Sequence, residues 1–468
     1  MILCGLIMSL SAFAQSSVTV KHPHMTRDAQ KTIIKQRPLF FPATITCSNS
    51  VEESINKVTF IYSDGSMQAT EVTLNNYYVN DMYVTKDSVY FCGKQFNPLM
   101  GIIGRFEINE FFNNTGEAHI DTNIIAGDVN PLLVEELTRL EYYIDYMENK
   151  HLLCIGTCEE DGYPCLVDLL LPFNTYKAGY VDSKHEVFTD LKVVSSNYTD
   201  MPYLATVGYD LEYGRYLNIR LYKAYDIFSS TGPQDWCHVY CMGATPVRKW
   251  LEGGALIDNV DNNTFSTISY RSGNGQLPRF DSVYYLASFS NVHIGLFDIN
   301  SIASNSVYGL VDNYEVALGI TYRREMSQFV YNSYKKTFVF LHRYNASLTS
   351  SLHNEYCEII KPSLSTSGSF LAYTNPGTLH YGLSLYRSDN KYILSGHNIN
   401  DPRTLMYQMH TFGTLSGCAE PLEYNYEQQK TIESYNFKRN FQYGLRECES
   451  KEPVGEMGRI PIYIECEK

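Results

Sequence analysis

Short apolar runs, each closing on Gly, Ser or His, recur along the chain. They begin near positions 90, 152, 203, 239, 284, 338 and 392, as in VYFCG from Val89 and YILSGHN from Tyr392. Runs of this length, rich in aromatic and β-branched residues and bounded by turn residues, predict buried β-strands. Their mean spacing is about 50 residues, and a period of about 40 to 50 built from strands and turns is typical of a propeller blade.

One phrase occurs twice. IGRFEIN (Ile103–Asn109) returns as IGLFDIN (Ile294–Asn300). VYFCG precedes the first copy and VYYLAS, from Val283, precedes the second, so the repeat is a pair of strands. The two copies are roughly 190 residues apart, close to four periods, which predicts the same strand four blades later. We expect the Phe to point between blades and the Gly to allow a close approach or a bulge.

These patterns predict an all-β protein, and within that class a β-propeller. Blades cannot bury both faces alone and therefore stack around an axis. Seven runs predict seven blades, with six as the alternative because the run at Val239 is the least regular. A β-sandwich array or another all-β fold is the competing architecture. One segment, Asn130–Met147, has apolar residues near helical spacing and predicts a helix that leads into the next blade.

The chain divides into four expected parts. Residues 1–14 predict a signal peptide, because an apolar run closes on Ala12-Phe13-Ala14 before Gln15, although no Lys or Arg precedes the run. Residues 15–37 follow as an N-terminal linker, 38–416 as the propeller and 417–468 as a C-terminal appendage. A secreted or periplasmic protein is therefore expected.

Ring closure is a further expectation. In propellers an N-terminal strand can complete the last blade and remove the open edge. KVTFIY (Lys57–Tyr62) is a candidate for that strand, unless it simply belongs to the first blade.

Composition narrows the functional classes. The chain has 468 residues, 44% of them hydrophobic, and contains 39 Tyr and 23 Phe against 2 Trp, which favours strands. A net charge of -14 argues against nucleic acid as a partner, because a basic face is the usual footprint of such binding. No window past the leader approaches the ~18 apolar residues of a membrane span, and we expect a monomer.

The twelve cysteines suggest structural roles. Cys154 with Cys158, and Cys237 with Cys241, lie in apolar runs, so we expect core cysteines there and neither a metal site nor a disulfide. The polar tail holds better disulfide candidates. Cys448 with Cys466 is our choice, with Cys418 as a partner for either one.

The chain resembles uncharacterised exported β-propeller proteins of Gram-negative bacteria. The resemblance rests on the AFAQ end of the leader, on VYFCG and IGRFEIN, and on the richness in Tyr and Asn, and it covers most of residues 38–415. It implies a fold and a compartment, and it transfers no catalytic residue.

No motif identifies a chemistry. The chain has no Gly-x-Ser-x-Gly elbow, no His-Glu-x-x-His, no Walker loop and no Ser-x-Asp-x-Gly-x-Thr-Trp box. We therefore expect no cofactor, no metal and no assigned catalytic residue. Two function classes stay open: a module that binds a glycan or protein outside the cytoplasm, and a polysaccharide hydrolase or lyase with carboxylates at the central funnel.

A binding module would use its loops, because the strands of the blades are committed to packing. The segments that follow four of the apolar runs are candidates: KQFNPLMG from Lys94, EEDGYP from Glu159, DLEYGR from Asp210 and NINDPR from Asn398. Within them we single out three ligand-binding candidates, Tyr163, Tyr213 and Arg403.

Overall fold

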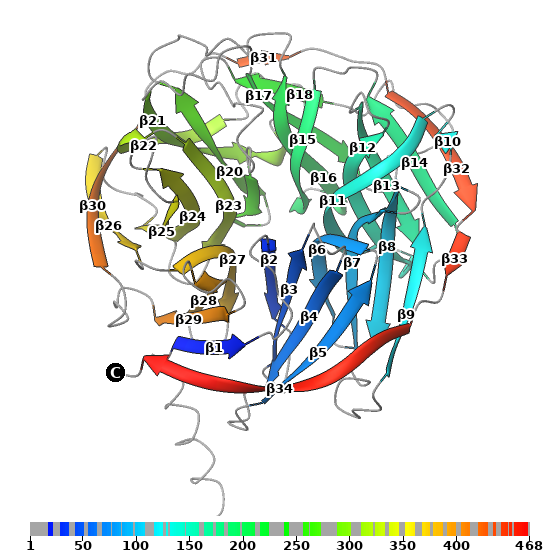
Figure 1. Cartoon of the computed structure of the whole chain (residues 1–468). Helices are drawn as coiled ribbons and strands as arrows, with labels where there is room; N and C mark the ends of the chain where they lie inside the picture. Colours follow the sequence, from blue (N-terminus) through cyan, green and yellow to red (C-terminus); the bar gives the residue numbers. More distant parts are fainter. Residues whose placement is uncertain are drawn as a thin grey trace, which may run out of the picture.

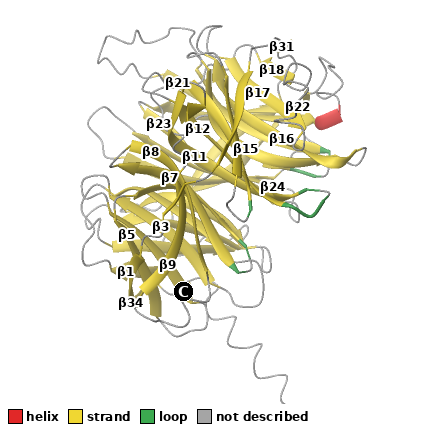
Figure 2. Ribbon diagram, turned by 90° about the vertical axis from the view of Figure 1, so that its right-hand side faces the viewer, coloured by secondary structure: helices red, strands yellow, loops and turns green. Residues whose placement is uncertain are grey.

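The computed structural model is built of β-strands almost throughout the part of the chain that it describes (Figures 1 and 2). Two described residues, Ile299 and Asn300, are helical. Besides these and the strands, the structure describes only residues 85, 87, 145, 147–149, 171, 260, 261 and 263. Among all these residues, no helix is both long and apolar enough to cross a bilayer. The strands are β1 (Ser17–Lys21), β2 (Ala29–Gln36), β3 (Ala43–Ser50), β4 (Ile55–Tyr62), β5 (Gln68–Asn75), β6 (Tyr77–Val84), β7 (Ser88–Phe96), β8 (Leu99–Glu107), β9 (Glu117–Ile124), β10 (Asp128–Val129), β11 (Leu132–Ile144), β12 (Lys150–Cys158), β13 (Tyr163–Leu170), β14 (Thr175–Val181), β15 (Glu186–Ser196), β16 (Thr199–Asp210), β17 (Tyr216–Lys223), β18 (His238–Met242), β19 (Leu256–Asn259), β20 (Thr264–Ser272), β21 (Ser288–Asp298), β22 (Leu310–Thr321), β23 (Arg323–Asn332), β24 (Thr337–Asn345), β25 (Leu352–Ile360), β26 (Ser367–Thr374), β27 (Thr378–Tyr386), β28 (Lys391–Asn398), β29 (Thr404–Thr411), β30 (Glu420–Gln428), β31 (Ser434–Asn436), β32 (Phe441–Glu447), β33 (Glu449–Lys451) and β34 (Val454–Cys466).

Consecutive strands pair antiparallel in up-and-down sheets, which we call units and number along the chain. Unit 1 is β2–β5, unit 2 is β6–β9 and unit 3 is β11–β14. Unit 4 is β15–β18, unit 5 is β19–β22 and unit 6 is β23–β26. Unit 7 has three consecutive strands, β27–β29, and takes β1 as its fourth. The described chain is all-β and antiparallel, which confirms the predicted fold class at that level.

The first strand of each unit contacts the first strand of the next. The contacts run in the order β2, β6, β11, β15, β19, β23, β27 and back to β2. Figure 1 shows the units placed around a common centre in this order.

The hydrophobic core lies between neighbouring units. One cluster joins units 2 and 3, a second joins units 3 and 4, and a third joins units 4 and 5. The second strand β12 serves two of them: Leu152 and Cys154 face unit 2, while Leu153 and Ile155 face unit 4. A strand that is buried on both faces reads as a continuous apolar run, which explains the runs seen in the sequence. Five of the seven runs lie in second strands, in β7, β12, β16, β24 and β28. The irregular run at 239 lies in β18, a fourth strand, and residues 283–287 of the run at 284 lie outside the described residues.

Glycine closes several of these runs because a β-bulge lies opposite. Gly93, Gly156 and Gly208 of the second strands face bulges in the first strands β6, β11 and β15. At each glycine, an added Cβ would overlap a carbonyl oxygen of the bulged strand. Only glycine permits this approach of the two backbones.

The predicted helix at Asn130–Met147 was wrong, because the structure has the strand β11 there. Two bulges in β11 each insert one residue, so Val134, Leu137 and Leu140 all point into the same core cluster. A spacing of three residues therefore comes from a bulged strand and resembles the spacing of a helix.

The prediction that the two copies of the repeated phrase lie in equivalent strands is confirmed, but the predicted number of units between them was wrong. IGRFE lies in β8 and IGLFD in β21, and both are third strands, of units 2 and 5. They are three units apart and not four, because the units between them are longer than the mean period. Phe297 packs in the core cluster between units 4 and 5, as predicted, and Gly104 admits the ring of Phe91 at close range.

The C-terminal strands β30–β34 (Glu420–Cys466), which we call the strap, add to the outer edges of the units in reverse order. β30 pairs with β26 and β22, β31 with β18, β32 with β14, and β33 with β9. β34 then pairs with β9, β5 and finally β1. In Figure 1 the strap is the orange and red ribbon at the rim of the molecule.

β1 joins the two ends of the chain. It pairs with β29 on one side and with β34 on the other, so one sheet runs from unit 7 through β1 and β34 to unit 1. The expected closing strand KVTFIY is instead part of β4, unit 1's own third strand. That was the alternative reading of this segment.

The expected division of the chain into four parts stays a prediction. Residues 1–16 lie outside the described residues, the expected linker at 15–37 holds β1 and β2, and the expected appendage at 417–468 holds the strap. Cys418 and Cys448 also lie outside the described residues, so the tail disulfide stays a prediction. Cys466 lies opposite Ser17 at the far end of the extended β34. A disulfide partner of Cys466 would therefore have to lie near β1.

Candidate functional site

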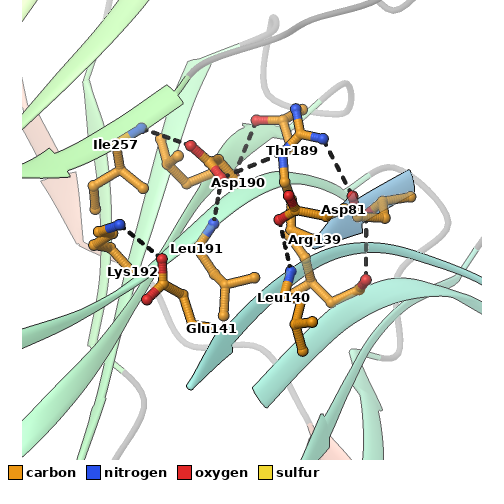
Figure 3. A network of polar contacts seen from close by, with 12 residues as sticks. Asp81, Arg139, Leu140, Glu141, Thr189, Asp190, Leu191, Lys192 and Ile257 are labelled. Atoms are coloured by element: carbon orange, nitrogen blue, oxygen red, sulfur yellow. Dashed lines mark hydrogen bonds and ion pairs between the residues drawn. The ribbon is translucent and has the colours of Figure 1, made fainter. Parts of the chain in front are cut away.

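Six charged side chains gather where the first strands of units 2 to 5 meet. Figure 3 labels all of them except Asp258. They form two tiers of three residues. In each tier the three residues come from three consecutive units, and the middle unit supplies the cation while the units before and after it supply carboxylates. The first tier is Asp81, Arg139 and Asp190, and the second is Glu141, Lys192 and Asp258.

The bulges of the first strands place the first tier. Asp81, Arg139 and Asp190 each come directly after the extra residue of a bulge, in β6, β11 and β15. Glu141 and Lys192 follow two residues later and share a face with their tier-one neighbours, because side chains alternate along a strand. The same local backbone feature therefore sets equivalent side chains side by side.

Two ion pairs join β11 to β15. Arg139 Nε lies 3.4 Å from Asp190 Oδ1, and Lys192 Nζ lies 2.7 Å from Glu141 Oε1. Lys192 Nζ is also 3.7 Å from Asp258 Oδ1 in unit 5. The exposed fractions of the Arg139 and Asp190 side chains are 17% and 16%, so this pair is largely shielded from water.

The aspartates also hold the backbone of a neighbouring unit. Leu140 N donates to Asp81 Oδ2 at 3.0 Å, Ile257 N to Asp190 Oδ2 at 3.0 Å, and Tyr331 N to Asp258 Oδ2 at 2.7 Å. Each of these bonds runs from the first strand of one unit to the first strand of the next.

The side-chain amides of two asparagines also link the first strands of neighbouring units. Asn80 Nδ2 donates to Leu137 O at 2.8 Å, and Asn259 Nδ2 donates to Val193 O at 2.9 Å. Both bonds again join the first strands of adjacent units.

Two groups in the cluster have a shifted pKa. Burial raises the pKa of Asp190 to about 6, although the charges of Arg139 and Lys192 act in the opposite direction. Burial alone would lower the pKa of Lys192, but the carboxylates of Glu141 and Asp258 outweigh it and raise that pKa. Lys192 is therefore a permanent cation, whereas Asp190 exchanges its proton close to neutral pH.

The cluster is best suited to fastening strands. Asp190 Oδ1 accepts from Leu191 N and pairs with Arg139, and its Oδ2 accepts from Ile257 N. A general acid or base must reach its substrate with the atom that exchanges the proton. Both oxygens of Asp190 already serve the first strands.

A second polar cluster lies at the turn between β11 and β12. His151 Nδ1 is 2.9 Å from Asp168 Oδ1, and its Nε2 is 3.4 Å from Asp145 Oδ2. The ring of Tyr143 stacks on the imidazole with centroids 4.6 Å apart. Burial alone would lower the pKa of His151, but the two carboxylates raise it.

Asp145 organises that turn. Its carboxylate accepts from the backbone N–H of Met147 and of Asn149, both at 2.8 Å, while Glu148 adopts a φ of 65°. Burial alone would raise the pKa of Asp145, but hydrogen bonds from Asn149, His151 and Met147 lower it below its usual value. The pair of Asp145 and His151 thus ties a turn to the strands beside it.

A third group lies fully buried within unit 4. Both Arg220 Nε and Nη2 donate to the Glu186 carboxylate, and Asn218 Nδ2 donates to Glu186 Oε1 at 2.7 Å. The exposed fractions of the Arg220 and Glu186 side chains are 1% and 0%. Such a pair is inaccessible to a ligand and serves packing.

Of the three ligand-binding residues expected from the sequence, one lies in the described part of the chain. Tyr163 is the first residue of β13, is half-buried, and meets the ring of Tyr180 edge-on at 5.8 Å. Tyr213 and Arg403 lie outside the described residues, so the grouping of the three stays a prediction.

The four loop segments nevertheless occupy one kind of position. They connect the second strand to the third in units 2, 3, 4 and 7. The predicted equivalence of these segments agrees with the order of the strands.

Sequence reasoning predicted none of these three groups. The sequence signal for the first cluster is a pair of charge patterns with opposite signs, on segments about 50 residues apart. Arg139 and Glu141 form one pattern, and Asp190 and Lys192 form the other. Pairs of this kind are common on solvated surfaces, so the spacing alone has little weight. The prediction of core cysteines is confirmed for Cys154 and Cys158, because both are buried in the core cluster of units 2 and 3.

No protein-family model and no curated protein matches the chain.

Proposed function

We propose that the chain is a seven-bladed β-propeller that works as a binding module, with a glycan or a protein as its ligand. Each unit would be one blade, with the first strand nearest the axis. The cyclic order of contacts between first strands supports this, since β27 returns to β2. The interfacial cores between units support it as well, because blades bury their faces against one another.

The direction of the first strands is the observation that carries the binding function. Arg139 meets Asp190, and two residues later Glu141 meets Lys192, so β11 and β15 run in the same direction. The bonds of Asn80 to Leu137 and of Asp81 to Leu140 give the same result for β6 and β11. In units with parallel first strands and the same up-and-down order, all connections from second to third strand lie on one rim.

That rim would carry the ligand. Three of the candidate segments, from Lys94, Glu159 and Asp210, belong to units 2, 3 and 4, and the fourth, from Asn398, belongs to unit 7. Loops tolerate change that the strands cannot, and Tyr and Arg side chains provide contact area and hydrogen bonds. Tyr163, Tyr213 and Arg403 are the residues we propose for that contact.

A matched pair of variants tests the rim. The first carries Tyr163→Ala, Tyr213→Ala and Arg403→Ala. The control carries Asp87→Ala and Met147→Ala, at the opposite rim, where the first and second strands of units 2 and 3 connect. Glycan-array and pull-down binding should fall at least about tenfold in the first variant and stay unchanged in the control. Equal binding by both variants would reject this rim as the binding surface.

A hydrolase or lyase acting on polysaccharide is the second candidate. Its one supporting observation is the raised pKa of Asp190, which is typical of a general acid. Because both oxygens of Asp190 hold the first strands, we place this function second. Turnover of a polysaccharide by the purified protein, abolished by Asp190→Asn in a folded variant, would replace the binding module by an enzyme.

We also propose that the protein is exported, to the periplasm or beyond, on the basis of the leader at residues 1–14. β1 begins at Ser17, so cleavage before Gln15 would leave it intact. N-terminal sequencing of the product from cells tests the site, and a retained leader would overturn it.

A further inference from the structure

The strap contacts the units in the reverse of their order along the chain. It passes the outer edges of units 6, 5, 4, 3, 2 and 1 and ends beside β1. The units themselves are hairpins between neighbouring strands. Two kinds of pairing therefore coexist, local ones within units and distant ones from the strap.

The sequence separations are very different in the two cases. Within unit 3, Cys158 pairs with Tyr163 across a short connection. In the strap, Thr175 of β14 pairs with Glu447, and Thr73 of β5 pairs with Glu456. Closing loops of hundreds of residues costs more chain entropy than closing a hairpin, so such contacts form late unless the intervening units are already in place.

The strap also covers edges that would otherwise be open. β14 and β18 each have a partner within their unit on one side and a strap strand on the other. Two of the strap strands, β31 (Ser434–Asn436) and β33 (Glu449–Lys451), are only three residues long. The cover is thus held by uneven stretches of backbone pairing, long in β30, β32 and β34 and short in β31 and β33.

Its last strand forms a seam. β34 pairs with β5 from Glu456 to Pro461, and with β1 from Ile462 to Cys466. β1, five residues long, is held by β29 on its other side. Loss of β34 would leave β1 as a short edge strand and would separate unit 7 from unit 1 at the rim.

We propose that the strap is a closing device: it docks last on units that are already formed, and its release is the first opening of the folded protein. The first strands stay in contact during this opening, because the charged tiers and the core clusters that join units 2 to 5 are made, among the described side chains, by residues of the units themselves. Release exposes the outer edges of β5, β9, β14, β18, β22 and β26, and exposed edges pair with other copies of the chain.

Hydrogen exchange of the full-length protein tests the device. Amides of β32 and β34 should exchange at least about tenfold faster than those of the second strands β12 and β16. In pulse labelling during refolding, the same amides should gain protection after those of β12. Equal exchange rates and simultaneous protection would overturn the proposal.

A variant separates strap release from general loss of stability. Leu445→Pro places a proline, with its fixed φ and without an N–H, in β32 opposite Lys177 of β14. We expect faster exchange in the strap and in β14, unchanged exchange in β12, and concentration-dependent self-association in size-exclusion chromatography. The matched control is Leu166→Pro in β13, which should unfold unit 3 together with its neighbours. If Leu445→Pro raised exchange in β12 as much as in the strap, the two would belong to one cooperative unit and the proposal would fail.

Discussion

Arg139 and Asp190 face each other across the contact between β11 and β15, with Nε and Oδ1 3.4 Å apart. Neither residue belongs to the same unit as the other, and Asp190 also takes the backbone N–H of Ile257 from a third unit. A single carboxylate therefore joins three successive first strands. Breaking this pair therefore tests whether the charged tiers hold the first strands of the units together.

Removing the cation should destabilise the protein more than removing a comparable surface charge. Arg139→Met leaves Asp190 largely buried without its partner, and we expect a loss of about 2 kcal/mol in the free energy of unfolding at pH 7.5. Urea denaturation measures it. Lys94→Met, which breaks the more exposed Lys94–Glu136 pair at 3.0 Å, is the control and should cost less than about 1 kcal/mol. A double variant, Arg139→Met with Asp190→Asn, should recover part of the loss, and an additive double variant would argue against coupling.

The pH dependence of stability should carry the signature of Asp190. Its pKa of about 6 lies above the value near 3.9 of an unfolded chain. The folded state thus holds a proton that the unfolded chain releases between about pH 4 and pH 6, so stability falls as the pH rises through that window. Asp190→Asn removes this titration. Across the window, the free energy of unfolding should then fall by less in the variant than in the wild type, and the difference should be on the order of 1 to 3 kcal/mol. An identical slope in the variant would place the raised pKa elsewhere.

His151 should act in a different window. Its pKa is raised by Asp168 and Asp145, so the imidazolium stabilises the folded state fully below about pH 6.5 and the contribution is lost as the pH rises through the raised value. His151→Gln should lower the melting temperature at pH 5.5 and have a smaller effect at pH 8.5. Resonances of the His151 ring followed by NMR against pH give the pKa directly. Asp168→Asn should bring it down, and an unshifted titration would show that Asp168 is not the cause.

Glycine at the bulges should be irreplaceable. In Gly156→Ala the new Cβ would overlap the carbonyl oxygen of Glu136, which is backbone and cannot turn away. We expect a loss of more than about 2 kcal/mol. Gly295→Ala is the control, because its nearest contact would be the Phe297 ring at 2.8 Å, and a side chain can shift. Equal losses at the two positions would mean that close backbone approach is not what selects glycine.

The second strands were the most predictable part of the fold. Three of them, β7, β12 and β16, are buried on both faces and close on glycine, and both properties can be read from single segments such as HLLCIG, from His151 to Gly156. The first strands were harder, because each bulge shifts the alternation that marks a strand, and in β11 this turned Val134, Leu137 and Leu140 into an apparent helix.

The candidate site could not be predicted for a related reason. Arg139, Asp190 and Asp258 meet only after the units are set beside one another, and nothing within any one segment shows which charge lies opposite. The strap has the same property, since backbone pairing between Thr175 and Glu447 leaves no trace in either side chain. Local pattern thus gives the strands, while the pairing of distant edges needs the assembled structure.

Ser17 and Cys466 are directly opposite one another in the pairing of β1 with β34. Opposed residues in an antiparallel pair have Cα atoms only about 5 Å apart, so a linker of a few residues could join the two positions without moving either strand. The sequence could then be opened elsewhere, for example in the turn at Asp145–Asn149, and every strand pair would be kept. The chain would then begin at a different unit, while the cyclic order of the units stayed the same. A circular permutant opened at that turn would fold to the same arrangement of units, and its strap would be an internal segment of the chain.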